Sequence, residues 1–266
     1  MSSVTGRISE VKQPRGGYIK PSQFEEIYFN DNIELGEENL HASIVGMVID
    51  YLTRYMTGVS VQDAFKISIA GYYTRGMLLG KEIVLKDKLK KIDIETLLKQ
   101  IKGLDDKSIT AACKACTYDV WRRNPMSAAM AKGADETIPD KTTIENIKAM
   151  VNRSIVFWEK YGPVIVDGFT FETDGYTDVV NSGDGDYLTA DTIWDFKVSK
   201  SKPNGKHTLQ LLMYWIMGQH SGKEEFKGIK RIGIFNPRLN TVYILDMNTV
   251  SVEIIKEVEA KVICYK

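Results

Sequence analysis

One short run of the sequence, Trp194-Asp195-Phe196-Lys197, carries residue types that could assist hydrolysis. If this run is a strand, residues i and i+2 share a face, so Asp195 and Lys197 point together while Phe196 points into the packing layer. A carboxylate beside an ammonium can hold a metal ion and orient an attacking water, and the Phe196 carbonyl is available as a further ligand. Other acid-x-Lys triplets occur in the chain, but we expect only this one to lie in a central strand.

A second carboxylate is expected close to Asp195. The run Gly175-Tyr176-Thr177-Asp178 precedes it, and a hairpin would bring Asp178 opposite Asp195. Two carboxylates a few ångströms apart are costly unless a cation lies between them. The alternatives are plainer: Asp195 and Lys197 could form an ion pair on an ordinary strand, and Asp178 could be a carboxylate at a hairpin end.

Two helices offer further polar side chains. Gln210 and Tyr214 are four residues apart, so they share one face of the helix expected over His207–Gly218. His41 stands in the first turn of a helix that is otherwise filled with apolar residues. Each of these features also has a structural interpretation, which is a half-buried helix face for Gln210 and Tyr214 and a helix-start residue for His41.

The elements that must position these residues can be predicted from the apolar periodicity. Up to residue 35 the chain is punctuated by Pro and Gly, which indicates an irregular arm with one short strand near Glu26–Phe29. Apolar residues then recur at three- and four-residue spacing, which predicts a helical region over residues 36–162. The helices expected there run from Glu38 to about Gly58 and over Val61–Leu79, Asp93–Ile101, Lys107–Arg123 and Thr142–Tyr161.

After Pro163 the apolar period changes from 3.6 to 2, which predicts strands. The elements expected in this part, in order, are strands over Val164–Phe171, Tyr176–Val180 and Thr192–Val198, the helix over His207–Gly218, strands over Gly228–Phe235 and Val242–Asp246, and a closing helix over Val250–Ile263. The sequence therefore predicts an α/β or α+β fold, with an N-terminal helical elaboration on a core over residues 163–266.

The charges are balanced overall but segregated locally. Lys and Arg together number 35, as do Asp and Glu, so no global charge requires a nucleic-acid or membrane partner. Between Pro163 and Trp194 there are acids and no Lys or Arg, whereas between Phe196 and Lys223 there are lysines and no acid. Carboxylates suit Mg²⁺ or Mn²⁺, and lysines neutralise phosphates. Hairpin tips that are acidic only because they are solvated are the alternative.

The order Gly-x-x-Asp, Asp-x-Lys and Gln-x-x-x-Tyr, with a His near the start of an N-terminal helix, resembles the RecB-like branch of the PD-(D/E)XK nuclease superfamily. This branch includes nuclease domains of bacterial recombination complexes and CRISPR-associated exonucleases. The resemblance covers roughly Ile165–Tyr243 in motif order and spacing, and it reaches the N-terminal half through His41 and its helical character. It implies a PD-(D/E)XK nuclease core, with a mixed central sheet flanked by helices.

The resemblance also implies a role for each matching residue. The groups that would bind Mg²⁺ or Mn²⁺ are the side chains of His41, Asp178 and Asp195 and the carbonyl of Phe196. Lys197 would position the attacking water and stabilise the charge that develops on the phosphoryl group. Gln210 and Tyr214 would hold this face of the site in place or contact the nucleic-acid backbone.

The activity that the resemblance implies is metal-dependent hydrolysis of DNA. The expected enzyme is an exonuclease acting on single strands or duplex ends, in repair, recombination or a mobile-element context. The near-zero net charge predicts modest affinity for free DNA, which a helicase or recombination partner would compensate. The alternatives are a catalytically silent relative that serves as a DNA-binding or interaction module, and a structure-specific or restriction-type endonuclease.

The cysteines and the composition limit further which class of protein this chain can belong to. Some RecB-like nucleases hold an iron–sulfur cluster on four cysteines, but this chain has Cys113, Cys116 and Cys264 alone, so we expect reduced thiols and no cluster. The chain has 266 residues, of which 43% are hydrophobic and 26% charged, an ordinary globular balance. No apolar stretch approaches the roughly 20 residues that span a bilayer. The first residues lack the apolar segment of a secretory signal. We therefore expect a soluble, cytoplasmic protein without a membrane partner.

Overall fold

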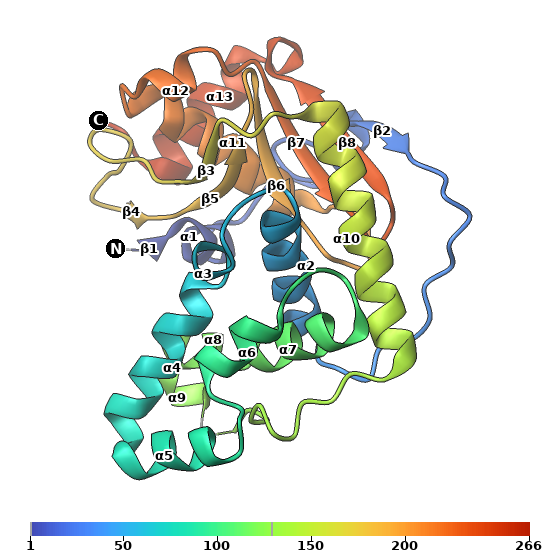
Figure 1. Cartoon of the computed structure of the whole chain (residues 1–266). Coiled ribbons are helices and arrows are strands. Elements are labelled where there is room, and N and C mark those ends of the chain that lie inside the picture. The colour runs from blue at the N-terminus through green and yellow to red at the C-terminus, as the bar shows by residue number, and fades with distance from the viewer. Residues whose placement is uncertain (1, 129) are drawn as a thin grey trace. The chain divides into compact units, whose positions relative to one another are not determined.

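The computed structural model describes residues 2–128 and 130–266 and divides the chain into two compact units (Figure 1). Unit 1 combines the chain up to Asn30 with Phe157–Lys266, and unit 2 is Asp31–Val156. The boundary falls within the long helix α10 (Lys141–Tyr161). The protein is of the mixed α/β class that the sequence predicts, with a helical region and a six-stranded mixed sheet flanked by helices.

Unit 1 is built on this six-stranded sheet. Its strands, in spatial order, are β2 (Glu25–Tyr28), β8 (Thr241–Asp246), β7 (Arg231–Asn236), β6 (Thr192–Phe196), β5 (Gly185–Leu188) and β3 (Val166–Phe169). Only β6 and β7 are parallel, and the other neighbouring strands are antiparallel. A parallel pair needs a crossover connection, which helix α11 (Gly205–His220) supplies between β6 and β7.

The alternation of side chains along β6 explains why both faces of the sheet are apolar. Trp194 points to the face where Phe157 packs, and the Phe157 ring stacks on Phe235 with ring centroids 4.2 Å apart. Ile193 points to the opposite face, which α11 covers with Leu212 and its neighbours. A strand buried on both faces is expected where helices lie on each side of a sheet.

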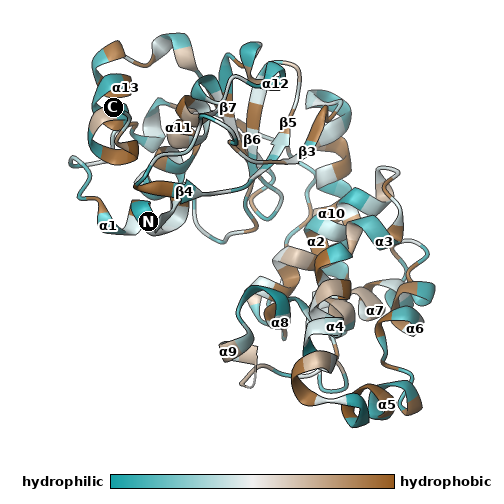
Figure 2. Ribbon diagram, turned by 90° about the vertical axis from the view of Figure 1, so that its left-hand side faces the viewer, coloured by the Kyte–Doolittle hydropathy of each residue, from teal (hydrophilic) through white to brown (hydrophobic). Residues whose placement is uncertain are grey.

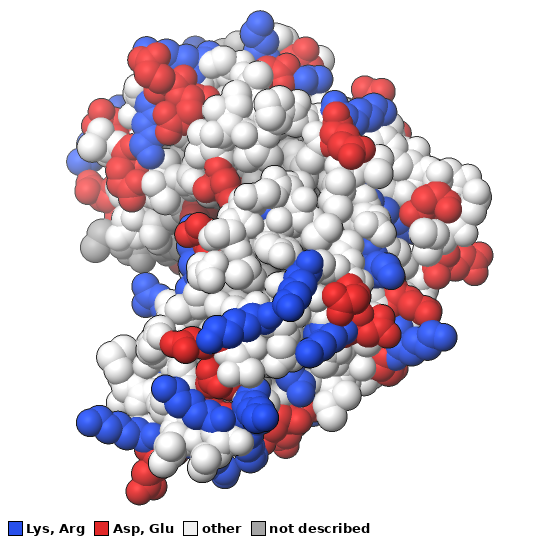
Figure 3. Space-filling model, in the orientation of Figure 1, with Lys and Arg blue, Asp and Glu red and all other residues white. Residues whose placement is uncertain are grey.

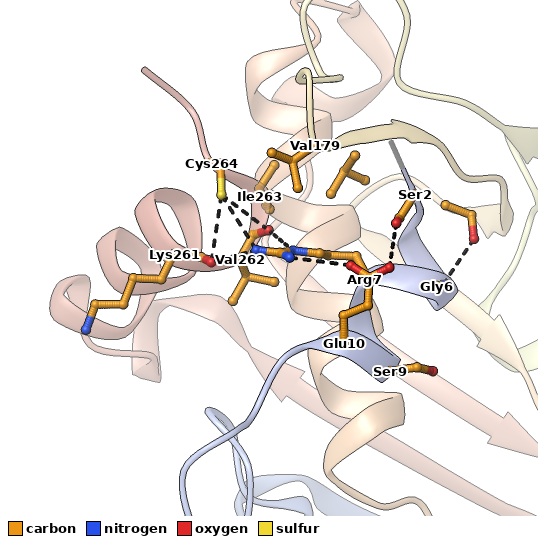
Figure 4. A network of polar contacts seen from close by, with 12 residues as sticks. Ser2, Gly6, Arg7, Ser9, Glu10, Val179, Lys261, Val262, Ile263 and Cys264 are labelled. Carbon is orange, nitrogen blue, oxygen red and sulfur yellow. Dashed lines mark hydrogen bonds and ion pairs between the residues drawn. The ribbon is translucent and has the colours of Figure 1, made fainter.

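The first 30 residues are more regular than the sequence suggests. The short strand expected near Glu26–Phe29 is confirmed as β2, but the expectation of an irregular arm is wrong for α1 (Val4–Glu10). Figure 4 shows Arg7 of this helix reaching the C-terminal segment, where its Nε donates to the Val262 carbonyl at 2.8 Å. Gly6 interrupts any apolar period, and the partners that stabilise α1 lie far away in sequence, so local patterns could not reveal it.

The remaining elements of unit 1 are short. They are β1 (Ser2–Ser3), which pairs in parallel with β4 (Val180–Ser182), the single turns Pro21–Gln23 and Met247–Thr249, α12 (Glu224–Lys227), α13 (Val252–Val258) and a terminal π-helical turn over Glu259–Ile263. The strand expected over Tyr176–Val180 is wrong, because β4 begins at Val180 and belongs to a separate two-stranded sheet. The phenol of Tyr176 instead donates to the Gly183 carbonyl across a loop.

Unit 2 is helical. Its helices before α10 are α2 (Ala42–Met56), α3 (Val61–Ala64), α4 (Lys66–Leu79), α5 (Lys81–Leu89), α6 (Ile94–Gln100), α7 (Asp106–Cys116), α8 (Asp119–Arg123) and α9 (Pro125–Ala128). Two helices expected to be continuous are each broken, one at Phe65 and one between Cys116 and Asp119. Both breaks let buried groups turn inward: the Phe65 ring meets Tyr51, and the buried Asp119 carboxylate accepts from the hydroxyls of Tyr51 and Ser68.

Helix α5 was not expected from the sequence. It mixes polar and apolar residues without a clear apolar stripe, as the hydropathy colouring in Figure 2 shows, and Leu85 and Leu89 are exposed on it. Apolar periodicity therefore gave no signal there. Within the described residues, no helix combines the length and the apolarity needed to cross a membrane.

Candidate metal centre

Two carboxylates meet at neighbouring ends of β5 and β6. The antiparallel register pairs Tyr187 with Trp194 and Leu188 with Ile193, so one further step places Asp186 beside Asp195. The Oδ2 atom of Asp186 accepts a hydrogen bond from the Phe196 backbone N–H at 2.8 Å. Alternation along both strands turns the two carboxylates toward the face that α11 covers.

Asp195 is the most buried member of this group. Its residue is 3% exposed, and its Oδ1 lies 3.0 Å from Nζ of Lys197. Its Oδ2 atom is buried and has no hydrogen-bond partner among the residues that the structure describes. A buried carboxylate oxygen without a partner costs free energy, so such an atom in a native site requires an explanation. A bound cation would satisfy it.

Lys197 carries its charge among these acids. Burial opposes the charged ammonium, but the carboxylates of Asp195 and Asp186 outweigh that effect, so the pKa of Lys197 lies above its usual value. The side chain is still partly open to solvent. The group therefore combines two carboxylates with one ammonium, which leaves room for a further positive charge.

The backbone of Phe196 supplies a third oxygen on the same side. In a strand, the N–H and C=O of one residue point toward the same neighbouring strand, and the Phe196 N–H points toward Asp186. Lys197, the next residue, donates its N–H to Phe235 of β7 on the other side. The donor set is thus all oxygen, as Mg²⁺ and Mn²⁺ prefer.

This donor set is small. No group of three or more His, Cys, Asp or Glu side chains that could hold a metal ion exists among residues 2–128 and 130–266. The side chains of Asp186 and Asp195 would therefore share a cation with the Phe196 carbonyl and water. Mg²⁺ commonly keeps several waters and uses one or two carboxylates, so the set fits that ion.

Gln210 and Tyr214 form the face of α11 that supports this group. The expected shared face is confirmed by the hydrogen bond from Gln210 Nε2 to the Tyr214 hydroxyl, which is 2.8 Å long. Tyr214 in turn donates to the Asp184 carbonyl at 2.7 Å, two residues before Asp186. Burial raises the pKa of the Tyr214 phenol far above its usual value, so the hydroxyl keeps its proton and remains a donor.

The expectation that Asp178 lies opposite Asp195 is wrong. Asp178 lies in the loop before β4, its side chain is 88% exposed, and its nearest ionic partner is Lys266 at 3.2 Å. The residue in register with Asp195 is Asp186 instead. The sequence held a signal for it, because Gly183-Asp184-Gly185-Asp186 repeats the Gly-x-x-Asp spacing. That run was interpreted wholly as a turn, whereas β5 begins at Gly185.

His41 belongs to unit 2, where its ring caps a helix. It is the N-cap residue of α2, and its Nδ1 lies 2.7 Å from Ser43 Oγ and accepts from the Ser43 backbone N–H. These contacts match the helix-start interpretation of this residue. Its role as a metal ligand stays a prediction.

His207 is a residue near the site that the motifs did not indicate. It precedes Gln210 by three residues and Tyr214 by seven, so all three share one face of α11. Burial and the charge of Lys197 lower the pKa of its imidazole. Its Nδ1 accepts from the Asn204 backbone N–H at 3.3 Å, which leaves Nε2 as the protonated nitrogen of the neutral ring. The sequence signal that could have indicated His207 is its spacing of three residues from Gln210.

The cysteines belong to elements other than those that carry the candidate site. Cys113 and Cys116 are buried on α7, and Cys264 follows the terminal π-helical turn. Burial raises the pKa of Cys113 to about 12 and that of Cys116 well above its usual value. Both α7 thiols are therefore protonated at neutral pH.

We compared the whole chain with known proteins. No protein-family model, curated protein or solved structure matches it. The chemistry of the site must therefore be inferred from its own residues.

Proposed function

We propose that this protein is a metal-dependent nuclease of the RecB-like PD-(D/E)XK type that hydrolyses DNA phosphodiester bonds as an exonuclease. The observation that carries the proposal is the buried Asp195 Oδ2, which lacks a hydrogen-bond partner within residues 2–128 and 130–266 and lies beside a second carboxylate and the ammonium of Lys197. An unpaired buried oxygen in such a group is accounted for by a cation that belongs there.

Asp186, Asp195 and the Phe196 carbonyl would hold this cation, with Mg²⁺ or Mn²⁺ as the ions that fit. When bound, such an ion supplies a Lewis acid for the phosphoryl oxygens and lowers the pKa of a coordinated water. Lys197, held at 3.0 Å by Asp195, orients the attacking water and stabilises the additional negative charge on the phosphoryl oxygens.

Gln210 and Tyr214 act as positioning residues in this proposal. Their hydrogen-bond chain ends on the Asp184 carbonyl and so fixes the segment that leads into Asp186. A carboxylate displaced by about 1 Å loses much of its catalytic value, which is why such supporting contacts matter.

Cleavage of labelled DNA tests the proposal directly. Linear and circular DNA, each single- and double-stranded, is incubated with Mg²⁺, Mn²⁺ or EDTA, using wild type, Asp195→Asn and Lys197→Ala. We expect cleavage of linear substrates that needs the metal and falls at least about 100-fold in both variants.

A matched control exists elsewhere in the chain. Glu225 and Lys227 form another acid-x-Lys triplet on the short helix α12, so Glu225→Gln and Lys227→Ala should leave cleavage unchanged. Cleavage of circular DNA would identify an endonuclease instead. DNA binding without cleavage under every condition would favour the catalytically silent module.

A further inference from the structure

Unit 2 contains a hollow whose walls are rich in lysine. It has a volume of about 360 Å³, and Lys90, Lys91, Lys107 and Lys114 are among the residues that line it. Asp106 is the only acid in its lining. Figure 3 shows lysine and arginine side chains over the region of α5, α6 and α7.

Two parts of the chain supply the lysines, and Leu97 and Gln100 of α6 complete the lining. Lys107 and Lys114 are seven residues apart on α7, so they stand one above the other on a single face of that helix. Thr110 and Ala111 lie between them in the sequence and also line the hollow, as does Ile92. Lys90 and Lys91 come from the turn that ends α5.

The lysine charges of the hollow are mostly uncompensated. Lys90 pairs with Asp135 at 2.6 Å. In the part of the chain that the structure describes, Lys91, Lys107 and Lys114 form no ion pair with a carboxylate, and Lys114 is half-buried. Like charges held around one concave surface repel, and an anion bound there relieves that repulsion.

We propose that this hollow binds phosphate groups of the nucleic-acid backbone. The inference rests on the proposed nuclease function, because it names a second place where the substrate is held. The lining contains no aromatic ring and no arginine, so it offers neither base stacking nor the bidentate fork that reads a base edge. Lysine ammonium groups act as point charges on phosphates, so binding here is independent of base sequence.

The phosphate group of a small molecule could bind a single lysine by the same charge interaction. A polymer differs because it places several phosphates against Lys91, Lys107 and Lys114 at once and releases a counterion at each contact. The strength of the salt dependence therefore distinguishes a strand from a mononucleotide.

The test is a binding titration without divalent metal. A fluorescein-labelled single-stranded DNA is titrated in EDTA, over a series of salt concentrations, with wild type and with the triple variant Lys91→Gln, Lys107→Gln, Lys114→Gln. The control is the triple variant Lys66→Gln, Lys141→Gln, Lys148→Gln, which removes the same charge from exposed positions of unit 2 outside the hollow.

We expect Kd to rise at least about tenfold at 0.1 M salt in the hollow variant, and the slope of log K against log salt to fall by about 2. The control variant should change neither value by more than about twofold. Equal losses in both triple variants, or unchanged binding in the hollow variant, would overturn the proposal. Thymidine 5′-monophosphate is added as a competitor of the DNA. A hollow variant that loses affinity for this mononucleotide alone would also overturn the proposal, because that result would identify a mononucleotide site.

Folding and the proposed function are controlled separately. Circular dichroism melting shows whether each triple variant is folded, and single substitutions at Lys107 and Lys114 replace the triple if it is not. Cleavage by wild type with Mg²⁺ is measured in parallel. A wild type that binds DNA through the hollow but never cleaves it would contradict the proposed nuclease and leave this inference standing.

Discussion

Asp195 holds Lys197 with one carboxylate oxygen, and its other oxygen is buried without a hydrogen-bond partner in the described part of the chain. With Asp186 beside it, the group has two negative charges and one positive charge, and a divalent cation would balance the excess. Substituting each of these residues should therefore have a different effect on the site. Losing either acid would remove one of the two proposed cation ligands, whereas losing Lys197 would leave both acids in place.

The first prediction separates the two carboxylates that the Gly-x-x-Asp pattern offers. Asp186→Asn should lower metal-dependent DNA cleavage by at least about 100-fold, because it removes one of two anionic ligands. Asp178→Asn is the control, and its exposed side chain predicts a change of less than about twofold. Isothermal titration with Mn²⁺ should show weaker binding in the Asp186 variant alone. Equal behaviour of the two variants would contradict this assignment.

A second residue-scale prediction concerns pH. The hydrogen bonds from Arg153 hold the pKa of Asp31 below its usual value, and the two groups form a bidentate pair with bonds of 2.6 and 2.9 Å. A carboxyl with a lowered folded-state pKa stabilises the fold above its unfolded pKa, near 4, and that stability is lost as pH falls through the folded value.

Asp31→Asn should therefore lower the free energy of unfolding by about 1–3 kcal/mol at pH 7. The difference from wild type should shrink steadily below about pH 4, where Asp31 becomes protonated in wild type as well. Urea unfolding at pH 7 and pH 3 measures both values. A difference that is the same at the two pH values would show that the ion pair is not its source.

At the scale of elements, β5 decides which acid faces Asp195. The strand begins at Gly185, and the structure requires glycine there, because a Cβ atom would lie 1.9 Å from Cζ of Phe169 on β3. Tyr214 of α11 fixes the preceding turn through the Asp184 carbonyl. The close contact between Gly185 and the Phe169 ring and the hydrogen bond from Tyr214 thus set the position of Asp186.

Gly185→Ala should force β3 and β5 apart. We expect a loss of about 2–4 kcal/mol in the free energy of unfolding, because the new methyl group would overlap the ring of the buried Phe169. Gly103→Ala is the control, since a Cβ there meets nothing within 4 Å. Chemical denaturation of both variants measures the difference. Similar stability in the two would mean that the strands adjust freely.

Tyr214→Phe tests the support from α11. Removing the hydroxyl leaves the Asp184 carbonyl and Gln210 Nε2 without this partner, which should cost about 1–3 kcal/mol of stability. The kcat for cleavage should fall while KM changes little, because the proposed role of Tyr214 is to position Asp186 through the Asp184 carbonyl. Tyr28→Phe, at an exposed tyrosine, should change neither quantity. An effect on KM alone would assign Tyr214 to substrate binding.

At the scale of the whole molecule, distant parts of the chain complete unit 1. Strand β2 covers the edge of β8, and α1 packs on α11 and bonds to the C-terminal segment through Arg7. Ile19 and Phe24, between them, are buried in the same core as α11. The first 30 residues therefore belong to the sheet unit, although about 125 residues of unit 2 separate the two segments.

Deleting residues 2–30 should prevent unit 1 from folding to a soluble form. The deletion uncovers buried apolar side chains and leaves β8 as an open edge strand, which favours aggregation. Soluble yield and size-exclusion chromatography measure the effect. Tyr28→Ala, at an exposed residue of the same segment, is the control and should leave the soluble yield unchanged. A soluble deletion variant with an intact far-ultraviolet spectrum would contradict the prediction.

The sequence by itself determined the elements with strong periodicity. It predicted the mixed α/β class, helices α10 and α11, strands β6, β7 and β8, and the adjacency of Asp195 to Lys197 and of Gln210 to Tyr214. These features depend on contacts within a few residues or on one amphipathic period, so local spacing is enough to reveal them.

Only the tertiary structure decided which carboxylate meets Asp195. Asp178 and Asp186 both follow a Gly-x-x pattern, and strand pairing, set by contacts between distant residues, selects Asp186. The same limit applies to α1, whose partners lie at the other end of the chain, and to the break at Phe65, whose buried ring contacts Tyr51. Register and burial arise from packing between segments, and a local pattern contains neither.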